Sequence, residues 1–125
     1  MNKLLFLLLL FSLNNETADK SECDKFREGT FKLDDGENVY TIIRTQNRQL
    51  ENAQGRGTME FKIRWMSDCS YILYDPKVVD GEGMPDAGSD TLYCKITSID
   101  GLSYRAKCKM RGYGEIETPP IVKIK

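Results

Sequence analysis

Apolar and charged residues alternate strictly between residues 59 and 65 of the chain. The apolar positions are Met59, Phe61, Ile63 and Trp65, and the charged positions between them are Glu60, Lys62 and Arg64. The same period of two recurs in the segments 92–97 and 104–110. Alternation of this kind is produced by a β-strand that buries one face and exposes the other to water.

Turn-forming residues separate these segments at regular intervals, and no window shows the spacing of an amphipathic helix. The pattern predicts eight strands, at about 26–33, 37–45, 48–53, 57–66, 69–78, 91–99, 103–111 and 116–124. We therefore expect an all-β, antiparallel up-and-down meander. A meander of short strands most easily satisfies its edges by curling into a small barrel or half-open barrel of the lipocalin/calycin type. A two-sheet β-sandwich is the alternative.

The first 18 residues have the layout of a secretory signal peptide. Lys3 precedes the apolar run Leu4–Phe11, and polar residues follow from Asn14. An apolar core of about ten residues is too short for a membrane-spanning helix, which needs about 20. The sequence thus predicts a signal peptide at 1–18 and a single β domain at 19–125, exported to the periplasm or secreted. Lipoprotein anchoring is disfavoured because Cys23 follows charged residues well beyond the apolar core.

The balance of charges argues against polyanionic partners. The chain carries 18 basic and 19 acidic residues and has a net charge of −1. Such a chain lacks the electrostatic footprint of a protein that binds nucleic acid or an anionic membrane. We expect no nucleic-acid partner, no transmembrane anchor and no cofactor.

Four cysteines, Cys23, Cys69, Cys94 and Cys108, indicate two disulfides in a small exported domain. A zinc site is disfavoured because the chain has no histidine and no CxxC pair. The loop 80–90 fails the EF-hand pattern, so no metal is expected there either.

The strand register predicts which cysteines pair. If a three-residue loop, Asp100–Leu102, joins strands 91–99 and 103–111, Cys94 falls opposite Cys108 on the buried face. A two-residue turn would require a bulge for the same bridge. Cys23 and Cys69 then pair by elimination, which ties the N-terminal segment to the start of the fifth strand.

Several short motifs resemble a known family. They are Cys23-x-x-Phe26, Gly29-Thr30-Phe31, Ile43-Arg44-Thr45 and Trp65-x-x-Asp68-Cys69. Together they resemble a family of small, uncharacterised, exported bacterial β proteins, some of which carry an automatic DNA topoisomerase IV label. The resemblance covers most of residues 23–75 and implies no activity. Topoisomerase activity is implausible, since the chain has neither an ATPase motif nor a DNA-cleaving tyrosine domain. The Gly-x-Trp motif of lipocalins is also absent, and Gly29-Thr30-Phe31 stands in its place.

The residue types do not favour catalysis. Without histidine, the commonest general base is missing, and neither an SxxK nor a GxSxG motif occurs. The adjacent acids Asp34 and Asp35 are typical of a turn rather than a catalytic pair. We therefore expect a protein that is not an enzyme.

Aromatic residues supply the remaining candidates for a site. Phe31, Phe61, Trp65 and Tyr104 fall on predicted inward faces, where they would line a ligand cavity or fill the barrel. Four tyrosines are expected to form an outer patch: Tyr40, Tyr71, Tyr74 and Tyr93. The leading hypothesis is an exported, non-enzymatic binding module for a small apolar molecule or a protein partner. The alternative is a structural or accessory envelope protein with a filled barrel.

Overall fold

A computed structural model describes residues 20–81 and 91–125 of the chain, and it confirms the all-β antiparallel meander. The helical elements are α2 (Lys20–Cys23) and η2 (Asp24–Phe26). The strands are β1 (Gly29–Asp34), β2 (Val39–Arg44), β3 (Arg48–Ala53), β4 (Gly57–Ser67), β5 (Ser70–Gly81), β6 (Leu92–Asp100), β7 (Ser103–Met110), β8 (Ile116–Glu117) and β9 (Ile121–Lys123).

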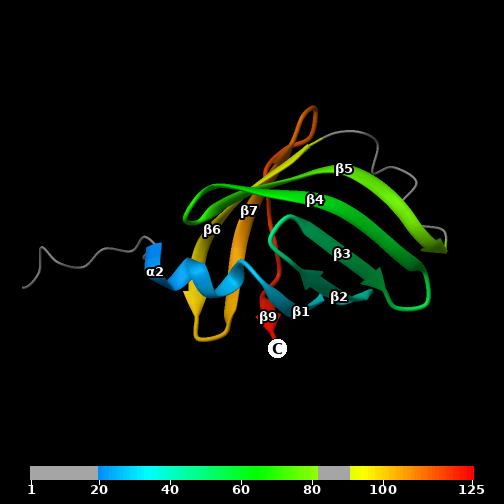
Figure 1. Cartoon of the computed structure of the whole chain (residues 1–125), viewed down its shortest axis with the longest axis horizontal. Helices are drawn as coiled ribbons and strands as arrows, with labels where there is room; N and C mark the ends of the chain where they lie inside the picture. The colour runs from blue at the N-terminus through cyan, green and yellow to red at the C-terminus, as the bar shows by residue number, and fades with distance from the viewer. Residues whose placement is uncertain (1–19, 82–90) are drawn as a thin grey trace, which may run out of the picture.

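All nine described strands belong to one sheet, in the order β6-β5-β4-β3-β2-β1-β9-β7-β8. An additional β6–β7 pairing closes eight of them into a ring, while β8 pairs only with β7. The ring is uneven: β4 and β5 pair along their whole length, but β5 and β6 pair only from Ser70↔Lys95 to Leu73↔Leu92. Figure 1 shows β4 and β5 crossing the molecule as its two longest strands. The alternative of two separate sheets is therefore not what the chain forms.

The last predicted strand is split in two. Residues 116–124 form β8 and β9, and Pro119 and Pro120 lie between them. Proline has no N–H to donate to a sheet, so two in a row interrupt the pairing. After this break the chain changes neighbours: β9 inserts between β1 and β7 and closes the ring.

The N-terminal segment is helical where a strand was predicted to begin. Phe26 belongs to η2, and the first strand starts only at Gly29. The helical segment crosses one end of the barrel (Figure 1). There Phe26 is fully buried, its ring centroid lies 4.8 Å from that of Tyr104, and a disulfide ties Cys23 to Cys69. Phe26 thus closes this end of the barrel.

The β6–β7 hairpin contains the predicted Cys94–Cys108 disulfide, but its turn differs from the predicted one. Asp100 pairs with Ser103, so the turn has two residues, Gly101 and Leu102, and the predicted three-residue loop is wrong. A bulge at Thr97 then shifts the register, and Cys94 comes opposite Cys108, to which it is bonded. Gly101 has φ +60°, a value that glycine adopts readily at the first position of such a turn.

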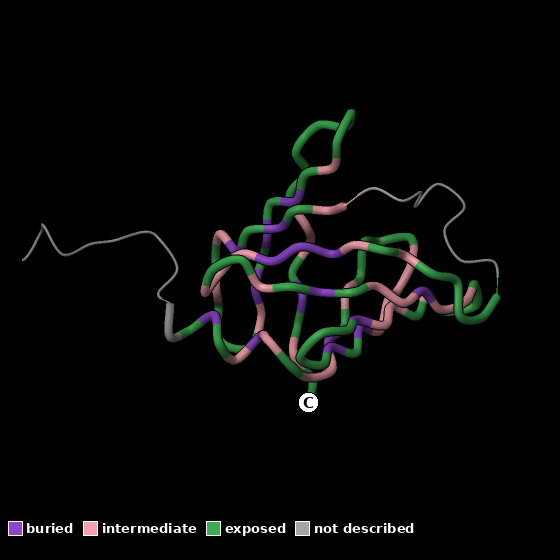
Figure 2. The backbone as a smooth tube through the Cα atoms, turned by 45° about the horizontal axis from the view of Figure 1, so that its top comes forward, coloured by how far each residue is buried: buried purple, intermediate pink, exposed green. Residues whose placement is uncertain are grey.

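The core lies inside the ring, and in Figure 2 buried positions recur along the strands. On β7, for example, Tyr104, Ala106 and Cys108 are buried and the residues between them are exposed. Both disulfides contribute sulfur to this core. Two disulfides indicate folding in an oxidising compartment.

Candidate functional site

A buried arginine occupies the middle of the core. Arg44, at the end of β2, is only 2% exposed. Its Nε donates to Gln49 Oε1 at 2.8 Å, Nη1 donates to the carbonyl oxygen of Phe26 at 2.8 Å, and Nη2 donates to the Tyr104 hydroxyl at 3.0 Å. Each nitrogen of the guanidinium therefore has a partner, as a buried charge requires.

Aromatic rings surround this guanidinium. Its carbon lies 4.8 Å from the ring centroids of Phe31 and Tyr71, and about an ångström further from those of Trp65 and Tyr104, at 6.0 and 5.9 Å. Cation–π contacts at these distances stabilise the charge. The hydroxyls of Tyr71 and Tyr104 are also hydrogen-bonded to each other at 3.0 Å. We call this group the Arg44 cluster: Phe31, Arg44, Gln49, Trp65, Tyr71 and Tyr104.

Three of the four aromatic residues predicted to bind a ligand belong to the Arg44 cluster. Phe31 and Tyr104 are fully buried and Trp65 is half-buried. Phe61 also packs against the core, further along β4, and does not contact the arginine in any ring interaction. The structure thus brings Phe31, Trp65 and Tyr104 together, but around a side chain of the protein itself.

The predicted outer tyrosine patch is wrong for Tyr71. Tyr71 pairs with Trp65 on β4 and with Cys94 on β6, and all three point into the core. Burial raises the pKa of the Tyr71 hydroxyl well above its ordinary value. Tyr93 is exposed, and Tyr40 and Tyr74 are half-buried.

Sequence reasoning missed Arg44 and Gln49, which are the buried polar residues of the part of the chain that the structure describes. The period of two could have identified Arg44, because Arg44 lies two residues after Ile42 and so shares its inward face. Gln49 is directly opposite Arg44 in the β2–β3 pairing and shares that face. Its strand, β3, has few apolar residues, so the inward face was not recognised.

Glu51 occupies the next inward position on β3. Gln49 Nε2 donates to Glu51 Oε1 at 2.7 Å, which extends the hydrogen-bonded chain from Tyr71 through Tyr104, Arg44 and Gln49 to a carboxylate. Burial raises the pKa of Glu51, against the Gln49 hydrogen bond and the charge of Arg44, which lower it. The chain of hydrogen bonds holds side chains in place, and it contains no nucleophile next to a base.

An apolar recess lies at the other end of the β6–β7 hairpin, away from its turn. Its volume is about 370 Å³. Leu92 and Met110 pair with each other at this end, and Cys108 is the next inward residue of β7. We call it the β7–β8 recess, lined by Leu92, Cys108, Met110, Tyr113, Gly114 and Ile116. None of these described residues is charged.

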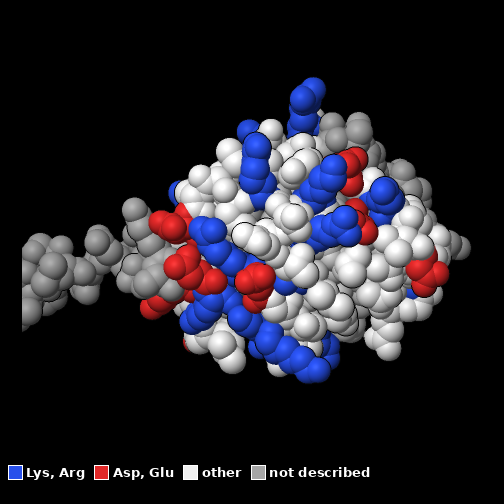
Figure 3. Space-filling model, viewed as in Figure 1, with Lys and Arg blue, Asp and Glu red and all other residues white. Residues whose placement is uncertain are grey.

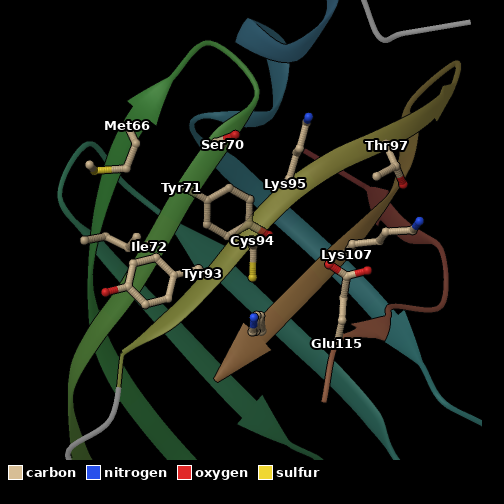
Figure 4. Close-up of a pocket in the computed structure, with 11 residues that line it drawn as sticks. Met66, Ser70, Tyr71, Ile72, Tyr93, Cys94, Lys95, Thr97, Lys107 and Glu115 are labelled. Atoms are coloured by element: carbon tan, nitrogen blue, oxygen red, sulfur yellow. The ribbon is translucent and has the colours of Figure 1, made fainter. Parts of the chain in front are cut away.

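A second hollow lies over β5, β6 and β7, and Figure 4 shows the side chains that line it. Its volume is about 640 Å³. Lys95 and Lys107 project along it, and Glu115 is the one acidic side chain among the described residues of the lining (Figure 4). We call it the lysine hollow, lined by Met66, Ser70, Tyr71, Ile72, Tyr93, Cys94, Lys95, Thr97, Lys107, Lys109 and Glu115.

Charges of both signs are mixed on one face of the molecule (Figure 3). Figure 3 shows basic and acidic side chains side by side on the face that it presents. Among the described residues, no group of three or more histidine, cysteine, aspartate or glutamate side chains could hold a metal ion. Within 20–81 and 91–125, no helix has the length and apolar character needed to cross a membrane. No family model, curated protein or solved structure matches the chain.

Proposed function

We propose that this protein is an exported, non-enzymatic binding module that takes a small apolar ligand in the β7–β8 recess. The observation that carries the proposal is the recess itself, with a volume of about 370 Å³ and no charged residue among the described residues that line it. Ligand sites are typically concave, mostly apolar and between about 300 and 1,000 Å³. The recess lies at the lower end of this range, so it suits a small molecule or one large side chain.

The proposed export rests on two independent features. Residues 1–18 have the polar–apolar–polar layout of a signal peptide. All four cysteines are paired in disulfides, which form in oxidising compartments outside the cytoplasm. The resemblance of residues 23–75 to a family of small exported bacterial proteins supports the same location.

A structural or accessory role is the second candidate, and the Arg44 cluster favours it. Aromatic rings and hydrogen-bonded polar groups fill the barrel around Arg44, where a ligand would otherwise enter. An accessory protein would need only this filled core. The two candidates differ in whether the β7–β8 recess takes up an apolar molecule.

Binding of N-phenyl-1-naphthylamine, an uncharged fluorescent probe, tests the proposal. We expect saturable fluorescence enhancement with the full chain and about tenfold or more weaker binding by Ile116→Asp, because a carboxylate at the recess must lose water when the apolar probe binds. Ile116 is 62% exposed, so the substitution leaves the core intact. Ile124→Asp is the control, since Ile124 is 54% exposed and lies outside the recess. No saturable binding, or equal binding by Ile116→Asp, contradicts the proposal.

A further inference from the structure

The lysine hollow places like charges next to each other. Lys95 and Lys107 are directly opposite in the β6–β7 pairing, and Lys109 is two residues further along β7 on the same face. Like charges directly opposite each other destabilise strand pairing. None of these three lysines forms an ion pair with another residue in the part of the chain that the structure describes. Two described carboxylates lie beside these lysines. Glu115 lines the hollow, and Glu117, which forms an ion pair with Arg105, is opposite Lys107 in the β7–β8 pairing. The three ammonium groups outnumber these two carboxylates.

The floor and rim of the hollow differ in character. Ile72 is buried and forms part of its floor, while Met66 and Tyr93 are each 58% exposed at its rim. In Figure 4, Met66, Ile72 and Tyr93 gather on one side and the labelled lysines on the other. The hollow thus offers an apolar surface beside a row of ammonium groups.

The spacing of the lysines matches that of an extended peptide. Alternate residues of a strand are about 6.6 to 6.8 Å apart. Lys107 and Lys109 are alternate residues of β7, so they have this separation along the strand, and so do alternate residues of an extended peptide. A peptide with an acidic residue at every second position would therefore present carboxylates at the same repeat. The apolar side chains between them would face Ile72 and Tyr93.

We propose that the lysine hollow binds an extended acidic segment of a partner protein. This inference goes beyond the proposed function, because the hollow is separate from the β7–β8 recess and shares none of its lining residues. The net charge of the whole chain is −1, so the attraction for acidic groups is confined to the hollow. A long polyanion would also meet the acidic residues around it. Exposed ion pairs are individually weak, so several must form together and binding should depend on salt.

Fluorescence anisotropy with a labelled peptide of about ten residues that alternates aspartate and valine tests this inference. The peptide with asparagine in place of aspartate measures the contribution of charge. The variant Lys107→Gln/Lys109→Gln removes two charges from the hollow. The control, Lys32→Gln/Lys77→Gln, removes two exposed charges from outside it. Thermal unfolding of both variants shows that they are folded.

We expect the aspartate peptide to bind at least about tenfold more tightly than the asparagine peptide, and to weaken as NaCl rises from about 20 to about 300 mM. The hollow variant should lose about tenfold in affinity, and the control should change by less than about twofold. Equal losses in the two variants, or equal affinity for the two peptides, overturn the proposal. Tighter binding to DNA or to anionic vesicles than to the aspartate peptide also overturns it.

Discussion

Arg44 shows how one residue can be charged and buried at once. Removing a guanidinium from water is costly unless its N–H groups find acceptors. Here the three acceptors come from distant parts of the chain: Gln49 lies 5 residues away, Phe26 18 and Tyr104 60. Arg44 therefore connects η2, β2, β3 and β7 through hydrogen bonds as well as through packing.

Replacing Arg44 with methionine should destabilise the protein by about 3 kcal/mol or more, because Gln49 and the Phe26 carbonyl lose a charged donor inside the core. Urea unfolding at neutral pH measures the loss. Arg64→Met is the control: Arg64 is exposed on β4, so its replacement should change the stability little. A loss no larger for Arg44→Met than for Arg64→Met would show that the hydrogen bonds contribute nothing net.

Glu51 should make the stability depend on pH. Burial raises its pKa in the folded state, so the folded protein holds the proton more tightly than the unfolded chain does. The stabilisation from this proton is complete below the unfolded pKa and is lost as pH rises through the folded pKa. Glu51→Gln cannot ionise, so it does not lose this stabilisation as the pH rises. The free energy of unfolding of the variant minus that of the natural protein should therefore be larger at about pH 7 than at about pH 4. Urea unfolding at both pH values measures the difference, and a difference that shrinks toward neutral pH contradicts the expectation.

At the scale of elements, strong alternation made most strands predictable. The first seven predicted strands are present, with ends shifted by three residues or fewer. The β6–β7 hairpin shows the limit: its disulfide was predicted correctly and its turn was not. A three-residue loop and a two-residue turn with a bulge at Thr97 give the same register at Cys94 and Cys108, so the pattern of apolar residues cannot separate them.

The other differences between the predicted and observed structure arise where a segment is too short to show a period or where apolar residues occupy both faces of a strand. The helical segment α2–η2 is too short to show a period of 3.6 residues. Residues Tyr71–Leu73 are buried on both faces of β5, so their run of apolar residues gives no sign of which side faces the core. For this reason the sequence pattern does not reveal that Tyr71 is buried.

The candidate sites differ in how far the sequence could predict them. Phe31, Trp65 and Tyr104 were assigned inward because apolar residues mark the buried face. Gln49 gave no such signal, since a buried amide depends on partners that only the folded chain supplies. The lysine hollow depends on the register of β6 against β7, which places Lys95 opposite Lys107. Charge alone, in a chain with a net charge of −1, could not indicate it.

At the scale of the whole molecule, the two ends of the described chain close the fold. β9 joins β1 to β7, and the Cys23–Cys69 disulfide holds α2–η2 at the end of the barrel. There η2 supplies both the Phe26 ring that packs on Tyr104 and the carbonyl that accepts from Arg44. The Cys94–Cys108 disulfide, in contrast, lies within a single hairpin that the strand pairing already holds.

Removing the Cys23–Cys69 disulfide should therefore cost more stability than removing Cys94–Cys108. The sequence separations are 46 and 14 residues. In the chain-entropy model, loops of this size contribute about 4 and about 3 kcal/mol, both large against the stability of a small domain. The variant Cys23→Ala/Cys69→Ala also frees η2 to move away from Arg44, whose donor Nη1 would lose the Phe26 carbonyl, and this adds to its loss. The variant Cys94→Ala/Cys108→Ala leaves its hairpin paired. Urea unfolding of the two double variants measures both losses. If the hairpin variant proves the less stable of the two, η2 does not hold the end of the barrel closed.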